Sequence, residues 1–169
     1  NQFFKFNKRI NPLQKTKEVY KKRDKFSEKE LKELSILFLI INNLDIFRKN
    51  IELISEVTFS NNLMTKFQQK LIDFLLSEKF FNRKKLRLED FDAKFRNIIN
   101  LINVNAPVKI ITKNKNEAEI FIMFNEIISE IKKIDLRKRV EFLEDKVSLN
   151  LDEKLYSELL SLRNQLKGG

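Results

Sequence analysis

Few side chains in this sequence have the type and spacing that chemistry requires. Asp90 and Asp92 form an Asp-x-Asp pair, a spacing that some metal-dependent nucleotidyl-transfer sites use. No glycine-rich strand and turn accompany the pair, and an apolar helical pattern follows it. Carboxylates at the start of a helix are stabilised by the positive end of the helix dipole. We therefore interpret the pair as a helix start rather than as a metal site.

The absent residue types exclude most other catalytic sites. The chain has no cysteine and no histidine, and its two glycines are Gly168 and Gly169. Zinc fingers, cysteine or histidine nucleophiles and most transition-metal sites need the first two residue types. A phosphate-binding loop needs glycines inside the chain. We expect no catalytic residue, no metal and no cofactor in these 169 residues.

Positive charge gathers in two parts of the sequence. Residues 1–26 carry nine lysines and arginines against two acidic residues, within a net charge of +10 for the whole chain. They show no sustained apolar period, so we expect a basic flexible linker that contacts nucleic acid at most weakly. A smaller basic cluster lies beside Phe80 and Phe81, where we expect a solvated loop rather than a nucleic-acid site. It consists of Arg83, Lys84, Lys85 and Arg87.

The remaining pattern indicates an all-α protein. A sheet protein needs glycine at its turns, whereas this chain has only two glycines and two prolines. Two capping boxes, Ser27 with Glu30 and Asn116 with Glu119, mark helix starts. No apolar run approaches the ~20 residues of a membrane span, so we expect no membrane contact. The apolar periodicity predicts helices over residues 27–42, 44–57, 60–75, 88–103, 116–149 and 152–167.

The long helix over 116–149 determines the predicted domain organisation. Its apolar residues step by four and three up to Ile131 and again from Val140, but these two positions lie nine residues apart. Nine residues are about two and a half turns, so the apolar stripe moves to the opposite face near Asp135. The alternative is a helix broken at Asp135. Both interpretations predict two packing units, a helical bundle over 27–134 and a C-terminal antiparallel helical hairpin over 135–169.

The predicted hairpin has the character of a protein-docking element. Residues 135–169 hold seven basic and seven acidic side chains, so the hairpin as a whole does not attract a polyanion. Two helices alone bury little surface and are marginally stable without a partner. Four large side chains lie off the main apolar stripes, and we expect them either to contact a partner or to pack back onto the bundle. These candidates are Phe142, Leu149, Tyr156 and Leu160.

The order of these patterns resembles the C-terminal helicase-binding domain of bacterial DNA primase (DnaG). The resemblance extends over residues 28–166. It rests on Glu30-Leu31-x-x-Leu34 leading into the apolar run and Asn42, on Phe59-Ser60 before a long helix, and on the ending Leu159-Leu160-Ser161-Leu162-Arg163-Asn164-Gln165-Leu166. The family commonly has a His-Pro step after the first helix, where this chain has Asn43-Leu44.

The resemblance implies a role at the bacterial replication fork, in the cytoplasm. The domain would dock primase onto the N-terminal collar of the hexameric replicative DNA helicase (DnaB type), so that RNA primers are made where DNA is unwound. Single-stranded DNA-binding protein is a further candidate partner. The parent chain would be a nucleotidyltransferase, with its zinc-binding and polymerase domains outside these residues. The first residue is Asn, and we expect this sequence to be a piece of a longer protein.

Three other functions stay open at this stage. The chain could be the N-terminal collar domain of a replicative helicase, which an ATPase domain after these residues would indicate. It could be a helical nucleic-acid-binding module, which the basic composition favours and the neutral hairpin does not. It could also be an unrelated interaction bundle.

Overall fold

The computed structural model describes residues 26–78, 83, 86–150 and 152–168. Every regular element in these residues is helical, which confirms the predicted all-α fold. The predicted linker lies outside the described residues except for Phe26, which packs against the core of the bundle. Lys84 and Lys85 of the predicted basic cluster also lie outside them.

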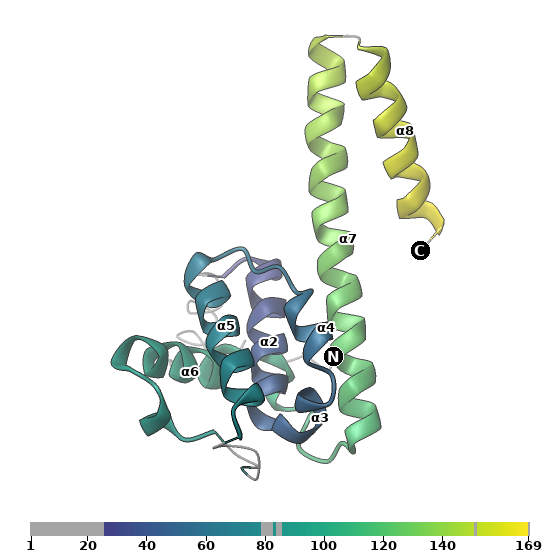
Figure 1. The fold of residues 1–169 in the computed structure, drawn as a ribbon. Coiled ribbons are helices and arrows are strands. Elements are labelled where there is room, and N and C mark those ends of the chain that lie inside the picture. The colour runs from purple at the N-terminus through teal and green to yellow at the C-terminus, as the bar shows by residue number, and fades with distance from the viewer. Residues whose placement is uncertain (1–25, 79–82, 84–85, 151, 169) are drawn as a thin grey trace, which may run out of the picture.

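The molecule consists of a bundle of helices from which one long helix projects (Figure 1). The α-helices are α2 (Glu28–Asn42), α3 (Leu44–Arg48), α4 (Ile51–Ser55), α5 (Asn62–Leu76), α6 (Ala93–Asn105), α7 (Glu117–Leu149) and α8 (Glu153–Gly168). Two 3-10 turns, η2 (Leu88–Asp90) and η3 (Pro107–Lys109), flank α6. The projecting half of α7 and the antiparallel α8 form the hairpin.

Helix α2 is the centre of the bundle. Every residue from Glu33 to Ile41 is buried, because α3, α6, η3 and the first half of α7 pack around it. Aromatic rings join the surrounding helices: the Phe47 and Phe124 ring centroids lie 4.7 Å apart, and Phe67 lies 5.6 Å from Phe95. A helix that is apolar on nearly all sides is stable only in such a position, so the sequence pattern of α2 determines how the bundle is arranged.

Three helix boundaries differ from the sequence prediction. The predicted helix over 44–57 is two short helices, because Asn50 leaves helical geometry at φ −130° and its side-chain amide donates to the Ile46 carbonyl. The helix over 88–103 begins later, at Ala93, where the Asp92 carboxylate accepts the Phe95 N–H at 3.0 Å. The third difference concerns the start of α5.

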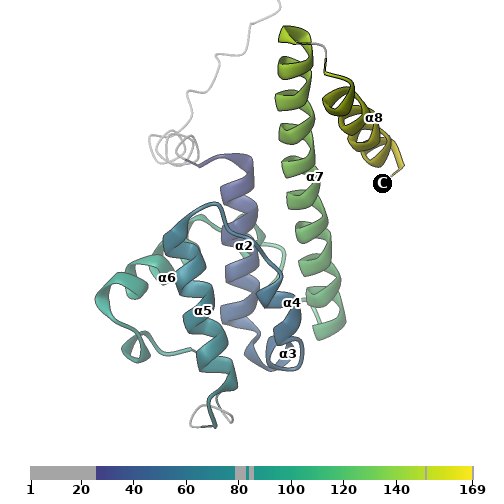
Figure 2. The same cartoon turned by 45° about the horizontal axis from the view of Figure 1, so that its top comes forward.

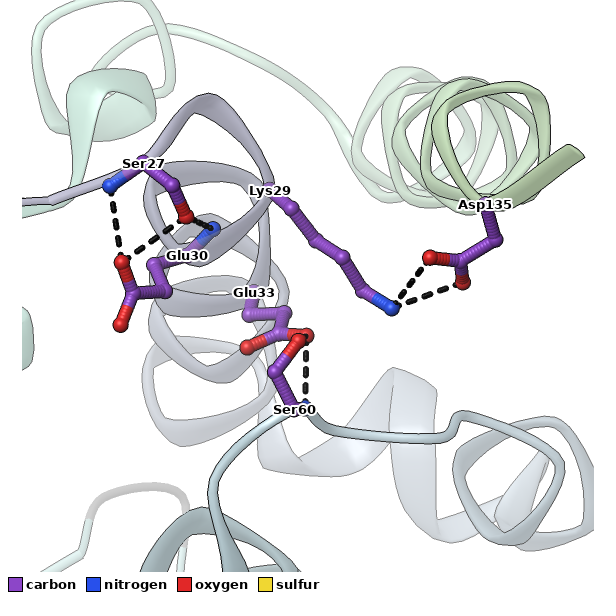
Figure 3. A network of polar contacts seen from close by, with 6 residues as sticks. All are labelled: Ser27, Lys29, Glu30, Glu33, Ser60 and Asp135. Carbon is purple, nitrogen blue, oxygen red and sulfur yellow. Dashed lines mark hydrogen bonds and ion pairs between the residues drawn. The ribbon is translucent and has the colours of Figure 1, made fainter. Parts of the chain in front are cut away.

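Ser60 is not the N-cap of α5, contrary to the prediction. Asn61 is the cap, and its side-chain oxygen accepts the Leu63 N–H at 2.8 Å. The Ser60 hydroxyl and N–H instead donate to Oε1 of the fully buried Glu33, at 2.7 and 2.8 Å (Figure 3). A buried carboxylate needs such donors, so this tertiary contact takes Ser60 away from the cap.

Helix α7 is one continuous helix of 33 residues, so the alternative of a break at Asp135 is wrong. Both predicted capping boxes, at Ser27 and at Asn116, are present. Along α7 the buried residues from Ile120 to Ile131 belong to the bundle core, whereas Val140 and Leu143 belong to a second core with Leu159 of α8. The change of face predicted near Asp135 therefore separates two hydrophobic cores.

Candidate docking surface on the helical hairpin

The core of the hairpin is small. Val140, Leu143 and Leu159 are its fully buried side chains, and Leu159 is the one buried residue of α8. Side chains that are partly buried extend this core toward both ends of the hairpin, namely Val147, Leu155, Leu162 and Leu166. α8 runs back beside α7 and ends about halfway along it (Figure 1). Most residues of α8 are exposed.

Two ion pairs lie on opposite edges of the seam between α7 and α8. Arg139 donates to Glu158 at 2.7 Å, and Arg163 donates to Glu144 at 2.6 Å. The two α7 residues are five positions apart, as are the two α8 residues, and five positions correspond to about 140° around a helix. The pairs therefore flank the apolar seam, one on each side, and define a first edge at Arg139 and a second edge at Arg163.

Phe142 marks the first edge. Its side chain is 47% exposed, and its ring lies between two cations, 5.7 Å from the Arg139 guanidinium and 4.7 Å from the Lys146 ammonium. Cations over an aromatic face are held by the charge distribution of the ring. Leu149 follows Phe142 by seven residues on the same side of α7 and is 87% exposed. The first edge thus presents apolar groups bordered by positive charge.

Tyr156 and Leu160 mark the second edge. They are one helical turn apart on α8, 46% and 43% exposed, and lie on the side of Arg163. All four candidate residues are therefore exposed and do not pack back onto the bundle. The structure does not bring them onto one face, however: Phe142 and Leu149 lie on one edge of the hairpin, and Tyr156 and Leu160 on the other.

The hairpin is electrically divided, although its sequence is neutral overall. Its distal part, residues 140–160, holds six acidic and two basic side chains, whereas residues 135–139 and 161–168 together hold five basic and one acidic. The antiparallel return of α8 brings its C-terminal turns beside the part of α7 next to the bundle (Figure 1). Sequence reasoning missed this separation because it summed the charge over the whole hairpin.

Polar contacts fix α7 to α2 where α7 leaves the bundle. The Lys29 ammonium contacts both carboxylate oxygens of Asp135, at 2.6 and 2.7 Å (Figure 3), and Lys32 pairs with Glu130. Close by, the N–H and hydroxyl of Ser27 donate to the Glu30 carboxylate at 2.8 Å and lower the pKa of Glu30. The two ion pairs between α2 and α7 are partly exposed, so they orient α7 more than they stabilise the fold.

The other candidate residues from the sequence lie around η2 and the start of α6. Asp92 caps α6, as expected of a carboxylate at a helix start. Asp90 lies in η2 and pairs instead with Arg83 at 2.7 Å. Both carboxylates line an open cleft of about 370 Å³ between α5 and α6. Arg87 of the predicted basic cluster is exposed, but Arg83 is partly buried by its pair with Asp90. Within the described ranges, no group of three or more metal-ligating side chains was found.

By architecture, the chain is a helical bundle that carries a projecting two-helix hairpin. Comparison with protein-family models, with curated proteins and with solved structures found no match. In the part of the chain that the structure describes, no helix is both long and apolar enough to cross a membrane.

Proposed function

We propose that this chain docks its parent protein onto a hexameric replicative DNA helicase of the DnaB type, as the C-terminal domain of the DNA primase that it resembles would do. The parent protein would then make RNA primers at the replication fork in the bacterial cytoplasm. The observation that carries this proposal is the projecting hairpin, which leaves the large side chains Phe142, Tyr156 and Leu160 43–47% exposed.

The size of the hairpin core supports a role in binding. Three buried side chains are few for a pair of helices that extends away from the bundle. Contact with a partner would bury the parts of Phe142, Tyr156 and Leu160 that are still exposed, which are 47%, 46% and 43%. Aromatic side chains in the centre of an interface are the usual energetic anchors.

The two edges make different demands on a partner. The first edge, with Phe142 between Arg139 and Lys146, fits an apolar pocket with an acidic border. The second edge, with Tyr156 and Leu160, fits an apolar groove that can pair with the Tyr156 hydroxyl. Both edges lie on a rigid continuous helix or its packed partner, so the proposed role is tethering with a fixed orientation.

Calorimetric titration of the full chain into the cognate helicase hexamer tests this proposal. Phe142→Ala removes the anchor of the first edge, and Tyr156→Ala removes that of the second. Truncating an anchor commonly costs about 2 kcal/mol or more, which is more than tenfold in affinity. We expect at least one of the two variants to bind at least tenfold more weakly than the parent, with its melting temperature unchanged.

Ile110→Ala is the matched control, because Ile110 is 76% exposed but belongs to the bundle, after η3. It should bind like the parent. If Phe142→Ala and Tyr156→Ala also bind like the parent, or bind weakly only because they unfold, the hairpin edges are not the helicase contact. The same titrations with single-stranded DNA-binding protein test the second candidate partner.

A further inference from the structure

The net positive charge of the chain comes from two segments of its sequence. Residues 132–139 of α7 hold five cations and one acid, and residues 1–26 hold nine cations and two acids. The remainder of the chain holds 20 cations and 21 acids. We call the five cations of α7 the basic band: Lys132, Lys133, Arg137, Lys138 and Arg139.

Ion pairs with α2 hold two of the acidic side chains on or beside the basic band. Asp135, the single acid among residues 132–139, is held by Lys29 at 2.6 Å. Glu130, one turn earlier on α7, is paired with Lys32. Lys132, Arg137 and Lys138 are exposed, and Lys138 attracts the carboxylate of Glu30. The five cations of the band outnumber Asp135 and Glu30, so the band keeps a net positive charge.

The first turn of α2 lies beside the basic band. The described chain begins at Phe26, immediately before α2, and the first turn of α2 contacts α7 at Asp135 through Lys29 (Figure 3). α8 ends beside the middle of α7 (Figure 2), and its last turn adds one more cation, Lys167.

We infer that the basic band is a binding surface for the phosphate backbone of single-stranded nucleic acid. Residues 132–139 span about 12 Å of helix, and their cations point to several sides of it because they are not spaced at one helical period. A flexible single strand can follow such a ring of charge, whereas a straight duplex touches one side of it.

A folded acidic protein fits the band less well. Interfaces between proteins have an apolar centre surrounded by a polar rim. The only aliphatic residues in this part of α7, Ile134 and Leu136, are partly buried within the chain. Binding to a phosphate backbone needs no apolar centre, since it is driven by the release of counterions from the nucleic acid. This inference does not depend on helicase binding. Of the five cations of the basic band, Arg139 alone also marks a hairpin edge.

The test measures binding of the full chain to a labelled single-stranded oligonucleotide by fluorescence anisotropy across a salt series. The band variant carries Lys132→Gln, Arg137→Gln and Lys138→Gln, which leave both hydrophobic cores and both hairpin ion pairs intact. Each phosphate contact on a single strand contributes about 0.7 to the slope of log affinity against log salt. We expect the slope to fall by about 2 and the affinity to fall more than tenfold.

A matched control removes the same charge elsewhere. Lys49→Gln, Lys66→Gln and Lys94→Gln neutralise three exposed lysines of the bundle, so both triple variants keep the same net charge. The control should bind like the parent. Equal loss in the two variants would show that only net charge matters and would overturn the proposal, as would equal binding of band variant and parent.

Two further outcomes would also overturn the proposed binding of single-stranded nucleic acid. If a duplex of the same length binds as tightly as the single strand, the band does not select a flexible strand. If polyglutamate displaces the oligonucleotide at an equal concentration of charges, the band is a surface for acidic proteins. The band variant should keep the helicase affinity of the parent, so failure of this proposal and failure of helicase docking are separate results.

Discussion

Replacing Leu159 by alanine is the sharpest test of the two-core structure. Leu159 is 3% exposed and is the single fully buried side chain of α8, in a core with Val140 and Leu143. The bundle core lies in other helices and does not include it. We therefore expect Leu159→Ala to release α8 from α7 while α2 and its neighbours stay folded, which is local rather than global unfolding.

The expected size of this effect follows from burial. A buried Leu→Ala substitution costs about 2–5 kcal/mol, because it removes the transfer free energy of the side chain and leaves a cavity. At about 1.4 kcal/mol for each factor of ten, the opening equilibrium of α8 shifts by roughly 30-fold or more. Hydrogen exchange followed by mass spectrometry measures this shift: amide protection in α8 should fall by that factor, and protection in α2 should not change.

Leu160 provides the control at the adjacent position. The chemical change in Leu160→Ala is the same, but Leu160 is 43% exposed and lies outside the hairpin core. Its effect on α8 protection should stay within about 0.5 kcal/mol, as is usual for surface substitutions. Equal protection loss at both positions would contradict the burial difference. Protection loss in α2 as large as that in α8 would mean that the two cores unfold as one cooperative unit.

Two other predictions concern the bundle. Removal of residues 1–25 should leave the helical circular dichroism and the melting temperature unchanged, because the first capping box begins at Ser27 and Phe26 is the first residue to pack on the core; a large loss of cooperativity would contradict this. Hydrogen bonds from Ser27 and Asn116 lower the pKa of Glu30 and Glu119 below the ordinary 4.5. Folded pKa values below the unfolded ones stabilise the protein above pH 4.5, and this stability is lost as the pH falls through the folded values. Thermal melting should therefore show a smaller loss on acidification for the Glu30→Gln, Glu119→Gln variant than for the parent.

Local signals in the sequence predicted the helix starts that depend on neighbouring residues alone. The boxes at Ser27 and Asn116 need only a side chain and a backbone three residues away, and both form as expected. The change of face along α7 was also predictable, since it depends on residue spacing along one helix. Ser60 shows the limit: it has the type of an N-cap residue, but the buried Glu33 on another helix binds it.

The candidate surface was predictable in its residues but not in its geometry. The off-stripe positions of Phe142 and Tyr156 left open whether these residues would be exposed or would pack back onto the bundle, and they are 47% and 46% exposed. Their separation onto opposite edges depends on how α8 is rotated against α7, which the pairs Arg139–Glu158 and Arg163–Glu144 reveal. The division of charge between the two ends of the hairpin likewise requires the antiparallel return of α8, since it places C-terminal cations beside residues about 30 positions earlier in the chain.

The continuous helix between the two cores gives each of the two proposed binding surfaces its own part of α7 or α8. Residues 132–139 contribute no fully buried side chain to either core, so their sequence is free to carry cations. Unbroken helical hydrogen bonding and the Lys29–Asp135 pair nevertheless hold this stretch in place. A partner bound at the distal edges of the hairpin would thus be kept at a fixed distance from a strand bound at the basic band. Substitutions of Lys132, Arg137 and Lys138 should then act on a separate activity from substitutions of Phe142 or Tyr156, because these three cations belong to neither hairpin ion pair.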